Sequence, residues 1–275
     1  MALQPYASKP ERVWYYAFRI YCALVFLFLV VPVFIVVPMG FSSSRYLTFP
    51  PPGFSLQYFE EFLNEPKWVL AVRSSFAIGL TTMVCATVIG TMAAVGLVRG
   101  RFRGKAVLTT FLISPMVIPL IISAVGLYFL YSQIGLVETF PGMVMAHTVL
   151  ATPFVVIVVS ATLHGFDRSL ERAAVSLGAS PVKAFIKVTL PVIAPGIVSG
   201  ALFAFITSFD EVVVALFLSG MEYRTLPVKM FEGIRYEVDP AIAAVATMVI
   251  FIAVLVLTTA ELLRRRGERL RGIRP

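Results

Sequence analysis

Residues 164–191 read HGFDRSLERAAVSLGASPVKAFIKVTLP, a polar and basic stretch between two long apolar runs. Asp167 is placed to cap a helix over residues 168–177, because an aspartate at this position accepts a hydrogen bond from a free N–H of the first turn. Gly178 follows where a left-handed residue commonly ends a helix. The sequence therefore predicts a first short helix with a defined start and end.

A second short helix follows in the same stretch. Ser180 and Pro181 supply an N-cap and a first-turn proline for a helix that extends through Val188. On the first helix, four apolar residues share one face at the spacing i, i+3, i+4, i+7: Leu170, Ala173, Ala174 and Leu177. A structured polar loop with an apolar face is typical of a surface on which a partner docks.

The composition places the rest of the chain in a membrane. Hydrophobic residues make up 59% of the 275 residues, and charged residues only 14%, whereas soluble domains average about 45–50% and about 25%. The net charge of +8 could indicate nucleic-acid binding, but the basic residues lie in the gaps between apolar runs, where they act as a topology signal. We expect a lipid bilayer and no nucleic acid as the environment.

The apolar runs are long enough to cross a bilayer, which takes about 20 residues of helix. They cover roughly residues 18–41, 70–98, 107–132, 143–163, 191–219 and 241–263. Most lysines and arginines fall before the first span, in the connections 99–106 and 164–191, and in a basic tail, residues 264–275, all on one side of these spans. The sequence predicts an all-α polytopic protein, a single domain over residues 1–275, with six transmembrane helices and both termini in the cytoplasm.

Prolines punctuate the third, fourth and fifth spans, at Pro115, Pro119, Pro153 and Pro195. Each removes a backbone hydrogen bond and favours a kink, which membrane helices tolerate where neighbours satisfy the freed carbonyl. Kinked core helices are typical of a bundle that rocks or opens. Proline is also common in membrane helices generally, which leaves an incidental interpretation open for any one of them.

Three polar residues interrupt the fifth span within the stretch Ser208, Phe209, Asp210 and Glu211. Adjacent carboxylates in an apolar helix are costly unless they face water or a cation. We expect them to line the outer part of a substrate path for a cationic solute. The alternative is a structural role, in which they pair with Arg73 or Arg224 or reach the headgroups.

The sequence shows none of the common catalytic or metal-binding motifs. It contains no G-x-x-x-x-G-K-[ST] phosphate loop, no H-E-x-x-H and no G-x-S-x-G. His147 and His164 are not spaced as metal ligands with cysteines or carboxylates. We therefore predict no catalytic residue, no metal site, no cofactor bound by this chain and no ATPase activity of its own.

The loop over residues 164–191 resembles the EAA motif of bacterial ABC importer membrane subunits, in which Glu-Ala-Ala precedes a glycine and an Ile-x-Leu-Pro end at fixed spacing. The matching residues here are Arg172, Ala173, Ala174, Gly178, Val188, Leu190 and Pro191, with every spacing kept. This chain departs from the motif at two positions. Arg172 stands at the glutamate position, with Glu171 one place earlier, and Val188 replaces isoleucine.

The resemblance implies a type I importer fold in which this loop is a cytoplasmic coupling helix. The implied coupling residues are Glu171, Arg172, Ala173, Ala174, Gly178, Leu190 and Pro191. The implied partners are a homologous membrane subunit, two ATP-binding subunits that hold ATP and Mg²⁺, and a periplasmic substrate-binding protein. The implied location is the bacterial inner membrane.

Three C-terminal segments are similar to the second membrane subunit of spermidine/putrescine importers: SFDEVVVALFLSG (208–220), TLPVKMFEGIR (225–235) and DPAIAAVATM (239–248). This similarity implies half of a translocation pore for a polyamine. Related subunits for ferric iron, thiamine, phosphonates or opines share much of the pattern. A stand-alone secondary transporter is a further alternative, although six spans show no second repeat half.

Overall fold

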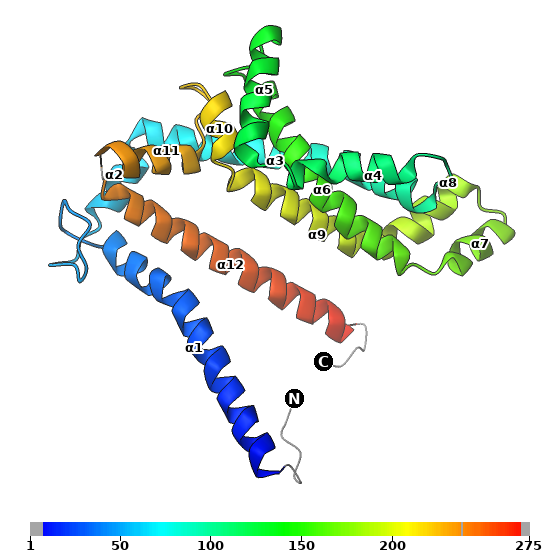
Figure 1. Ribbon diagram of the computed structural model, residues 1–275, viewed down its shortest axis with the longest axis horizontal. Helices are drawn as coiled ribbons and strands as arrows, with labels where there is room; N and C mark the ends of the chain where they lie inside the picture. The colour runs from blue at the N-terminus through cyan, green and yellow to red at the C-terminus, as the bar shows by residue number, and fades with distance from the viewer. Residues whose placement is uncertain (1–7, 238, 271–275) are drawn as a thin grey trace. The chain divides into compact units, whose positions relative to one another are not determined.

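The structure is a computed structural model that describes residues 8–237 and 239–270, and all the regular elements in this described part are helices (Figure 1). The chain divides into two compact units. The larger unit is Pro66–Glu232, and the smaller unit combines the residues up to Glu65 with those from Gly233 onward. The predicted coupling loop and substrate path both lie in the larger unit.

The smaller unit consists of two long helices and two short helical segments. These are α1 (Lys9–Gly40), α2 (Gln57–Asn64), the π-helix η3 (Gly233–Glu237) and α12 (Ala241–Leu270). The C-terminal end of α1 packs closely on α12, because a Cβ at Gly40 would meet the side chain of Thr247. Helix α12 extends through residues 264–270, so the first part of the predicted basic tail is helical; residues 271–275 of that tail lie outside the described residues.

The larger unit contains the remaining elements. In chain order they are α3 (Pro66–Arg99), α4 (Lys105–Ile113), the 3₁₀-helix η1 (Ser114–Met116), α5 (Leu120–Ile134), α6 (Phe140–His164), α7 (Arg168–Ser176), α8 (Pro181–Ala184), the π-helix η2 (Phe185–Thr189), α9 (Leu190–Phe209), α10 (Val213–Leu218) and α11 (Leu226–Glu232). Helices α3, α6 and α9 pack side by side and form its centre (Figure 1).

Glycines allow these three central helices to approach closely. A Cβ at Gly90 of α3 would lie 2.7 Å from the Cβ of Val155 on α6, and a Cβ at Gly196 of α9 would collide with the side chain of Thr162 on α6. Small residues at helix interfaces are the usual means of tight packing in membranes, where no water drives the helices together. The contact geometry therefore requires glycine at both positions.

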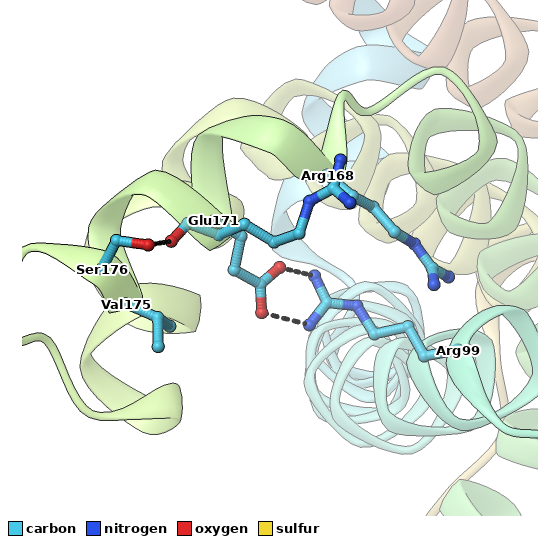
Figure 2. A pocket seen from close by; sticks show the side chains of 6 residues that line it. Arg99, Arg168, Glu171, Val175 and Ser176 are labelled. Carbon is cyan, nitrogen blue, oxygen red and sulfur yellow. Dashed lines mark hydrogen bonds and ion pairs between the residues drawn. The ribbon is translucent and has the colours of Figure 1, made fainter.

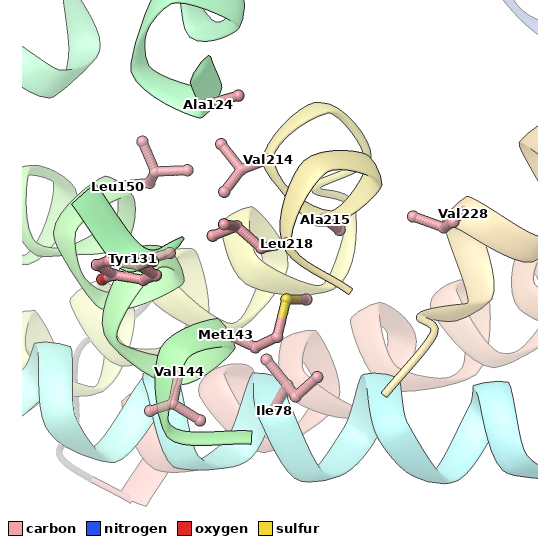
Figure 3. Packing of buried hydrophobic residues seen from close by; sticks show 11 residues of the cluster. Ile78, Ala124, Tyr131, Met143, Val144, Leu150, Val214, Ala215, Leu218 and Val228 are labelled. Carbon is pink, nitrogen blue, oxygen red and sulfur yellow. The ribbon is translucent and has the colours of Figure 1, made fainter. Parts of the chain in front are cut away.

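A cluster of buried apolar side chains joins the shorter helices to this centre (Figure 3). Val214 and Leu218 of α10 lie among Leu150 of α6 and Tyr131 of α5, while Ile78 of α3 contributes from below (Figure 3). All five side chains are buried. This cluster holds α10 against α5 and α6, next to the predicted substrate path.

The predicted spans match helices, but the count of six is not confirmed and stays a prediction. Within the described residues, four helical segments are long and apolar enough to cross a membrane: α1, α3, α6 and the continuous run Pro181–Phe209. The segment Lys105–Met116, formed by α4 and η1, would make a fifth span together with α5, but the two are bent by 99° at residues 117–119. The break predicted at Pro115 and Pro119 is thus confirmed, whereas α6 and α9 continue through Pro153 and Pro195.

The fifth span differs from its prediction at both ends. The second loop helix does not stop at Val188; the π-turn of η2, in which the N–H of Leu190 bonds to the carbonyl of Phe185, carries the chain directly into α9. Because proline at position 191 has no N–H to donate, the change of hydrogen-bond register just before it is physically reasonable. At the other end α9 stops at Phe209, so residues 191–219 are not one continuous helix.

Candidate functional site

The coupling loop begins with the predicted aspartate cap. The backbone N–H of Ser169 donates to Asp167 Oδ1 at 2.8 Å, and the Ser169 hydroxyl donates to Oδ2 at 2.6 Å. These two hydrogen bonds hold the pKa of the Asp167 carboxyl below its usual range, and the bond from the Ser169 hydroxyl contributes more than the bond from its N–H. Helix α7 therefore starts at Arg168, as the sequence predicts.

The same helix ends at a glycine, also as predicted. Gly178 has a φ of +92°, a conformation that residues with a Cβ rarely adopt. Its N–H donates to the carbonyl of Val175, and the N–H of Ala179 donates to the carbonyl of Ala174. This pair of bonds is the Schellman arrangement that satisfies the free carbonyls at a helix end, so Gly178 sets the sharp bend between α7 and α8.

The predicted apolar face of α7 is exposed. Leu170 is 50% exposed and Leu177 is 90% exposed, and Ala173 lies between them on the same face. A face of this kind is suited to contact with another protein. The apolar face of α7 is therefore available for contact with a partner, as the predicted coupling role requires.

Glu171, next to the motif's glutamate position, makes the main ion pair of the loop. Its carboxylate accepts two hydrogen bonds from the guanidinium of Arg99, at 3.0 Å and 2.6 Å (Figure 2). It accepts a third from the hydroxyl of Thr189 at 2.9 Å. Arg99 also donates to the Thr189 hydroxyl at 3.1 Å, and its guanidinium lies 5.3 Å from the centre of the Phe185 ring. Charge-assisted, two-pronged contacts of this kind are among the stronger hydrogen bonds in proteins.

These contacts connect three segments that are far apart in the sequence. Arg99 is the last residue of α3, Glu171 lies in α7, and Thr189 is the last residue of η2, directly before α9. The group formed by Arg99, Glu171 and Thr189, here called the loop clamp, therefore ties the coupling loop to two of the three central helices.

Arg172, at the motif's glutamate position, takes no part in the clamp. It is exposed and lines a surface pocket of about 750 Å³ next to the clamp. The other predicted coupling residues at the end of the loop, Leu190 and Pro191, form the first turn of α9. They lie directly after Thr189 of the clamp, so the motif's last residues connect the loop to the central helix.

Two of the four predicted path residues are buried and hydrogen-bonded within the protein. The hydroxyl of Ser208 lies 2.8 Å from Nδ1 of His147, and both residues are buried. The carboxylate of Glu211 accepts hydrogen bonds from the backbone N–H groups of Val214 and Ala215, at 3.0 Å and 2.9 Å. Glu211 therefore caps the first turn of α10. This cap accounts for the interruption between the end of α9 at Phe209 and the start of α10.

The other two path residues are more accessible. Phe209 packs against Phe76, with ring centres 5.3 Å apart, while Asp210 is exposed. Arg224, one of the cations considered as a partner, forms an ion pair with Glu232 at 2.9 Å. Within the described residues, neither Asp210 nor Glu211 forms an ion pair.

Asp210 lines a pocket of about 710 Å³ in the larger unit. Its walls come from the bend between α4 and α5, from α6, and from the break between α9 and α10: Pro115, Met116, Ile118, Leu120, Leu150, Phe154, Ile206, Thr207, Asp210, Glu211, Val212 and Val213. Two interruptions of the helices therefore meet at one pocket. Irregular backbone at membrane depth is tolerated where it lines a cavity, and broken helices commonly form transporter binding sites.

Comparison with known proteins gives the family. Residues 86–269 match the family described as "Binding-protein-dependent transport system inner membrane component". The chain belongs to this family. It is therefore an all-α, multi-pass inner-membrane protein of a transport system.

Two bacterial permeases illustrate the relationship within the family. The putrescine transport system permease protein PotI of Escherichia coli (strain K12) is 37% identical over 90% of each chain. The spermidine/putrescine transport system permease protein PotC of Haemophilus influenzae is 33% identical over 89% of this chain and 95% of that protein. Both relatives are permease subunits named for polyamine transport.

Solved structures share the fold. A bacterial ABC transporter involved in the import of alginate matches with a TM-score of 0.75, covering 94% of this chain and 99% of that chain at 17% identity. The same type of transporter in complex with an alginate-bound periplasmic protein matches with a TM-score of 0.68, covering 94% of this chain and 96% of that chain at 18% identity. The fold of this permease is thus that of ABC importer membrane subunits.

Sequence reasoning missed two residues that hold the site together, Arg99 and Thr189, and did not identify Ser208 as the partner of His147. Arg99 carries a recognisable signal, because a charged residue that ends a long apolar helix is placed to anchor a neighbouring loop. Thr189 and His147 carry no such signal. Their roles depend on partners 18 and 61 residues away.

Proposed function

We propose that this protein is the membrane subunit of an ABC importer, forms half of its translocation pore, and passes a polyamine such as putrescine or spermidine. The family and the relatives support the transport role. The observation that carries the mechanism is the loop clamp, which links the exposed coupling helix to α3 and α9.

The proposed partners follow from the surface of the loop. Two ATP-binding subunits hold ATP and Mg²⁺, and one of them receives the apolar face of α7. ATP-driven closure of these subunits moves α7 as a rigid body, and the clamp carries the displacement into the central helices. A homologous membrane subunit completes the pore, and a periplasmic binding protein delivers the solute.

Within the proposed path, Asp210 and Glu211 have different roles. Asp210 is exposed in the pocket where two helix breaks meet, so its carboxylate attracts the cationic solute. Glu211 is turned toward the first turn of α10 and fixes the shape of that break. The pocket volume of about 710 Å³ lies within the usual range for small-molecule sites, about 300–1,000 Å³.

Phe154 and Phe209 complete the proposed path. Phe154 lines the same pocket as Asp210, and an aromatic face attracts an ammonium group when water is excluded. Phe209 precedes Asp210 and packs on Phe76, which orients the end of α9. Apolar walls with the ring of Phe154 near the carboxylate of Asp210 match the chemistry of an alkyl diamine, which has apolar methylenes between its charged ends.

The proposal is tested by uptake in cells that depend on this importer for putrescine. Asp210→Asn is expected to lower uptake of the divalent cation while leaving the protein in the membrane. Thr207→Val, at another position that lines the pocket, is the matched control, since it keeps the side-chain size and carries no charge change. Unchanged putrescine uptake in Asp210→Asn would remove Asp210 from the path.

A further inference from the structure

A buried hydrogen bond joins two of the central helices close to the proposed path. Nδ1 of His147 on α6 lies 2.8 Å from the hydroxyl oxygen of Ser208 on α9, and both side chains are buried. The other ring nitrogen, Nε2, is also buried and has no hydrogen-bond partner among the described residues. In the part of the chain that the structure describes, the His147 ring therefore has Ser208 as its hydrogen-bond partner and no other.

Packing alone does not favour a histidine at this position. A buried polar atom without a hydrogen bond has lost its contact with water and has no contact in exchange. An apolar side chain of similar volume would fill the space between the helices and leave no nitrogen unpaired. The bond from Nδ1 to Ser208 is therefore what His147 adds over an apolar residue.

His147 shares a face of α6 with two residues of the pocket wall. Leu150 and Phe154, which both line the pocket of Asp210, follow His147 at i+3 and i+7, and this spacing places all three on one side of a helix. The bond to Ser208 thus joins α6 to α9 about one helical turn from the pocket.

The neighbours of Asp210 are each held by a different element. Ser208 is bonded to α6, the ring of Phe209 packs on α3, and Glu211 caps the first turn of α10. The N–H of Asp210 donates to the carbonyl of Ile206 at 2.9 Å, which keeps Asp210 in the last turn of α9. The place of Asp210 in the pocket is therefore set by the contacts of the residues beside it.

We propose that His147 is a positioning residue for the solute. Its hydrogen bond to Ser208 fixes the end of α9 against α6, and so sets the distance between the carboxylate of Asp210 and the ring of Phe154. The inference rests on the proposed function, in which these two groups hold one ammonium-bearing solute. Without the bond, the end of α9 can move away from α6, and the attraction of the ammonium to one of the two groups weakens with distance.

The test measures the rate of putrescine uptake by the complete importer in proteoliposomes, at saturating binding protein and with equal amounts of inserted permease. His147→Ala and Ser208→Ala are each expected to lower the rate about five- to tenfold, because each removes the same buried hydrogen bond. In a permease that already carries Asp210→Asn, His147→Ala is expected to lower the rate by less than about twofold, since a residue that acts through Asp210 has no carboxylate left to position.

Conservative variants distinguish the two ring nitrogens. His147→Asn places its amide near the position of Nδ1 and is expected to keep the rate within about threefold of the wild type, whereas His147→Gln places its amide near Nε2 and should resemble His147→Ala. Thr148→Val is the matched control on α6, because the buried Thr148 hydroxyl donates within its own helix, to the carbonyl of Val144 at 2.7 Å. This control is expected to stay within about twofold of the wild-type rate.

Three outcomes would overturn the inference. A wild-type rate in His147→Ala and Ser208→Ala would show that the bond positions nothing that transport needs. Equal losses from His147→Ala with and without Asp210→Asn would mean that His147 only stabilises the helix pair. Recovery by His147→Gln and not by His147→Asn would assign the role to Nε2. A wild-type rate in Asp210→Asn alone would contradict the proposed function itself, which none of the other three outcomes does.

Discussion

The loop clamp makes a specific prediction for Glu171→Gln. In the wild type, one carboxylate oxygen accepts from Arg99 and the other accepts from Arg99 and Thr189. A glutamine offers one oxygen in place of two, and its NH₂ group faces either the Arg99 guanidinium, which only donates, or the Thr189 hydroxyl, which donates to the wild-type carboxylate. At least one donor of Arg99 or Thr189 therefore loses its acceptor, and the charge attraction is removed.

The burial of the pair sets the size of the effect. The side chains of Arg99 and Glu171 are 24% and 21% exposed, so the pair lies between a surface pair, worth about 0.2–1 kcal/mol, and a buried pair, whose loss costs about 3–5 kcal/mol. We expect Glu171→Gln to weaken the anchoring of α7 by about 1.5–2 kcal/mol. That value corresponds to a factor of about ten to thirty in the opening equilibrium of the loop.

Hydrogen–deuterium exchange of the permease in nanodiscs measures this opening directly. Peptides that cover α7 should exchange about ten to thirty times faster in Glu171→Gln. Peptides from the centre of α6 should not change. Uptake should fall together with the protection of α7, because a loosened coupling helix passes less motion to the central helices.

The control substitution is Arg172→Gln, which removes a charge from the next residue of the same helix but leaves the clamp intact. It should leave the exchange of α7 unchanged. Equal exchange in the wild type and in Glu171→Gln would refute the anchoring role of the clamp. A double-mutant cycle of Arg99 and Glu171 with little coupling energy would lead to the same conclusion.

Three further predictions follow from local geometry. Gly178→Val places a β-branched residue at a φ of +92°, which costs about 1–2 kcal/mol or more; uptake and stimulated ATP hydrolysis should be lost, while membrane fractionation shows normal insertion. Glu211→Gln should speed exchange in the α10 peptides without changing substrate selectivity, whereas Asp210→Asn should lower uptake of a cationic solute without changing that exchange. Gly90→Leu should lower the thermal stability of the complex, since a Cβ there would lie 2.7 Å from the Cβ of Val155. The control Gly96→Leu should leave the thermal stability nearly unchanged, because the space around Gly96 is open.

The local features of the coupling loop could be predicted from the sequence because they depend on residues close together in the chain. The cap at Asp167 and the left-handed Gly178 each need only the next few residues as partners. The partner of Glu171 could not be predicted in this way, because Arg99 is 72 residues away. The sequence directed attention to Arg172, whereas the ion pair is made by the residue before it.

The substrate path shows the same limit. The polar residues in the fifth span lie where a helix breaks and a pocket forms, but the sequence predicted one continuous span there and did not show which of these residues face the pocket. Glu211 precedes by three and four residues the N–H groups that it caps, so its structural role has a short-range signal. The bond between Ser208 and His147 has none, since it depends on how α6 packs against α9.

The central claim is most directly tested with the importer reconstituted in proteoliposomes: this protein, its homologous membrane subunit, its ATP-binding subunits and its binding protein. The account predicts that putrescine or spermidine, presented on the binding protein, stimulates ATP hydrolysis and is taken up only when ATP is supplied, and that Glu171→Gln separates hydrolysis from uptake. Uptake driven by an ion gradient, by this protein without ATP-binding subunits, would contradict the account.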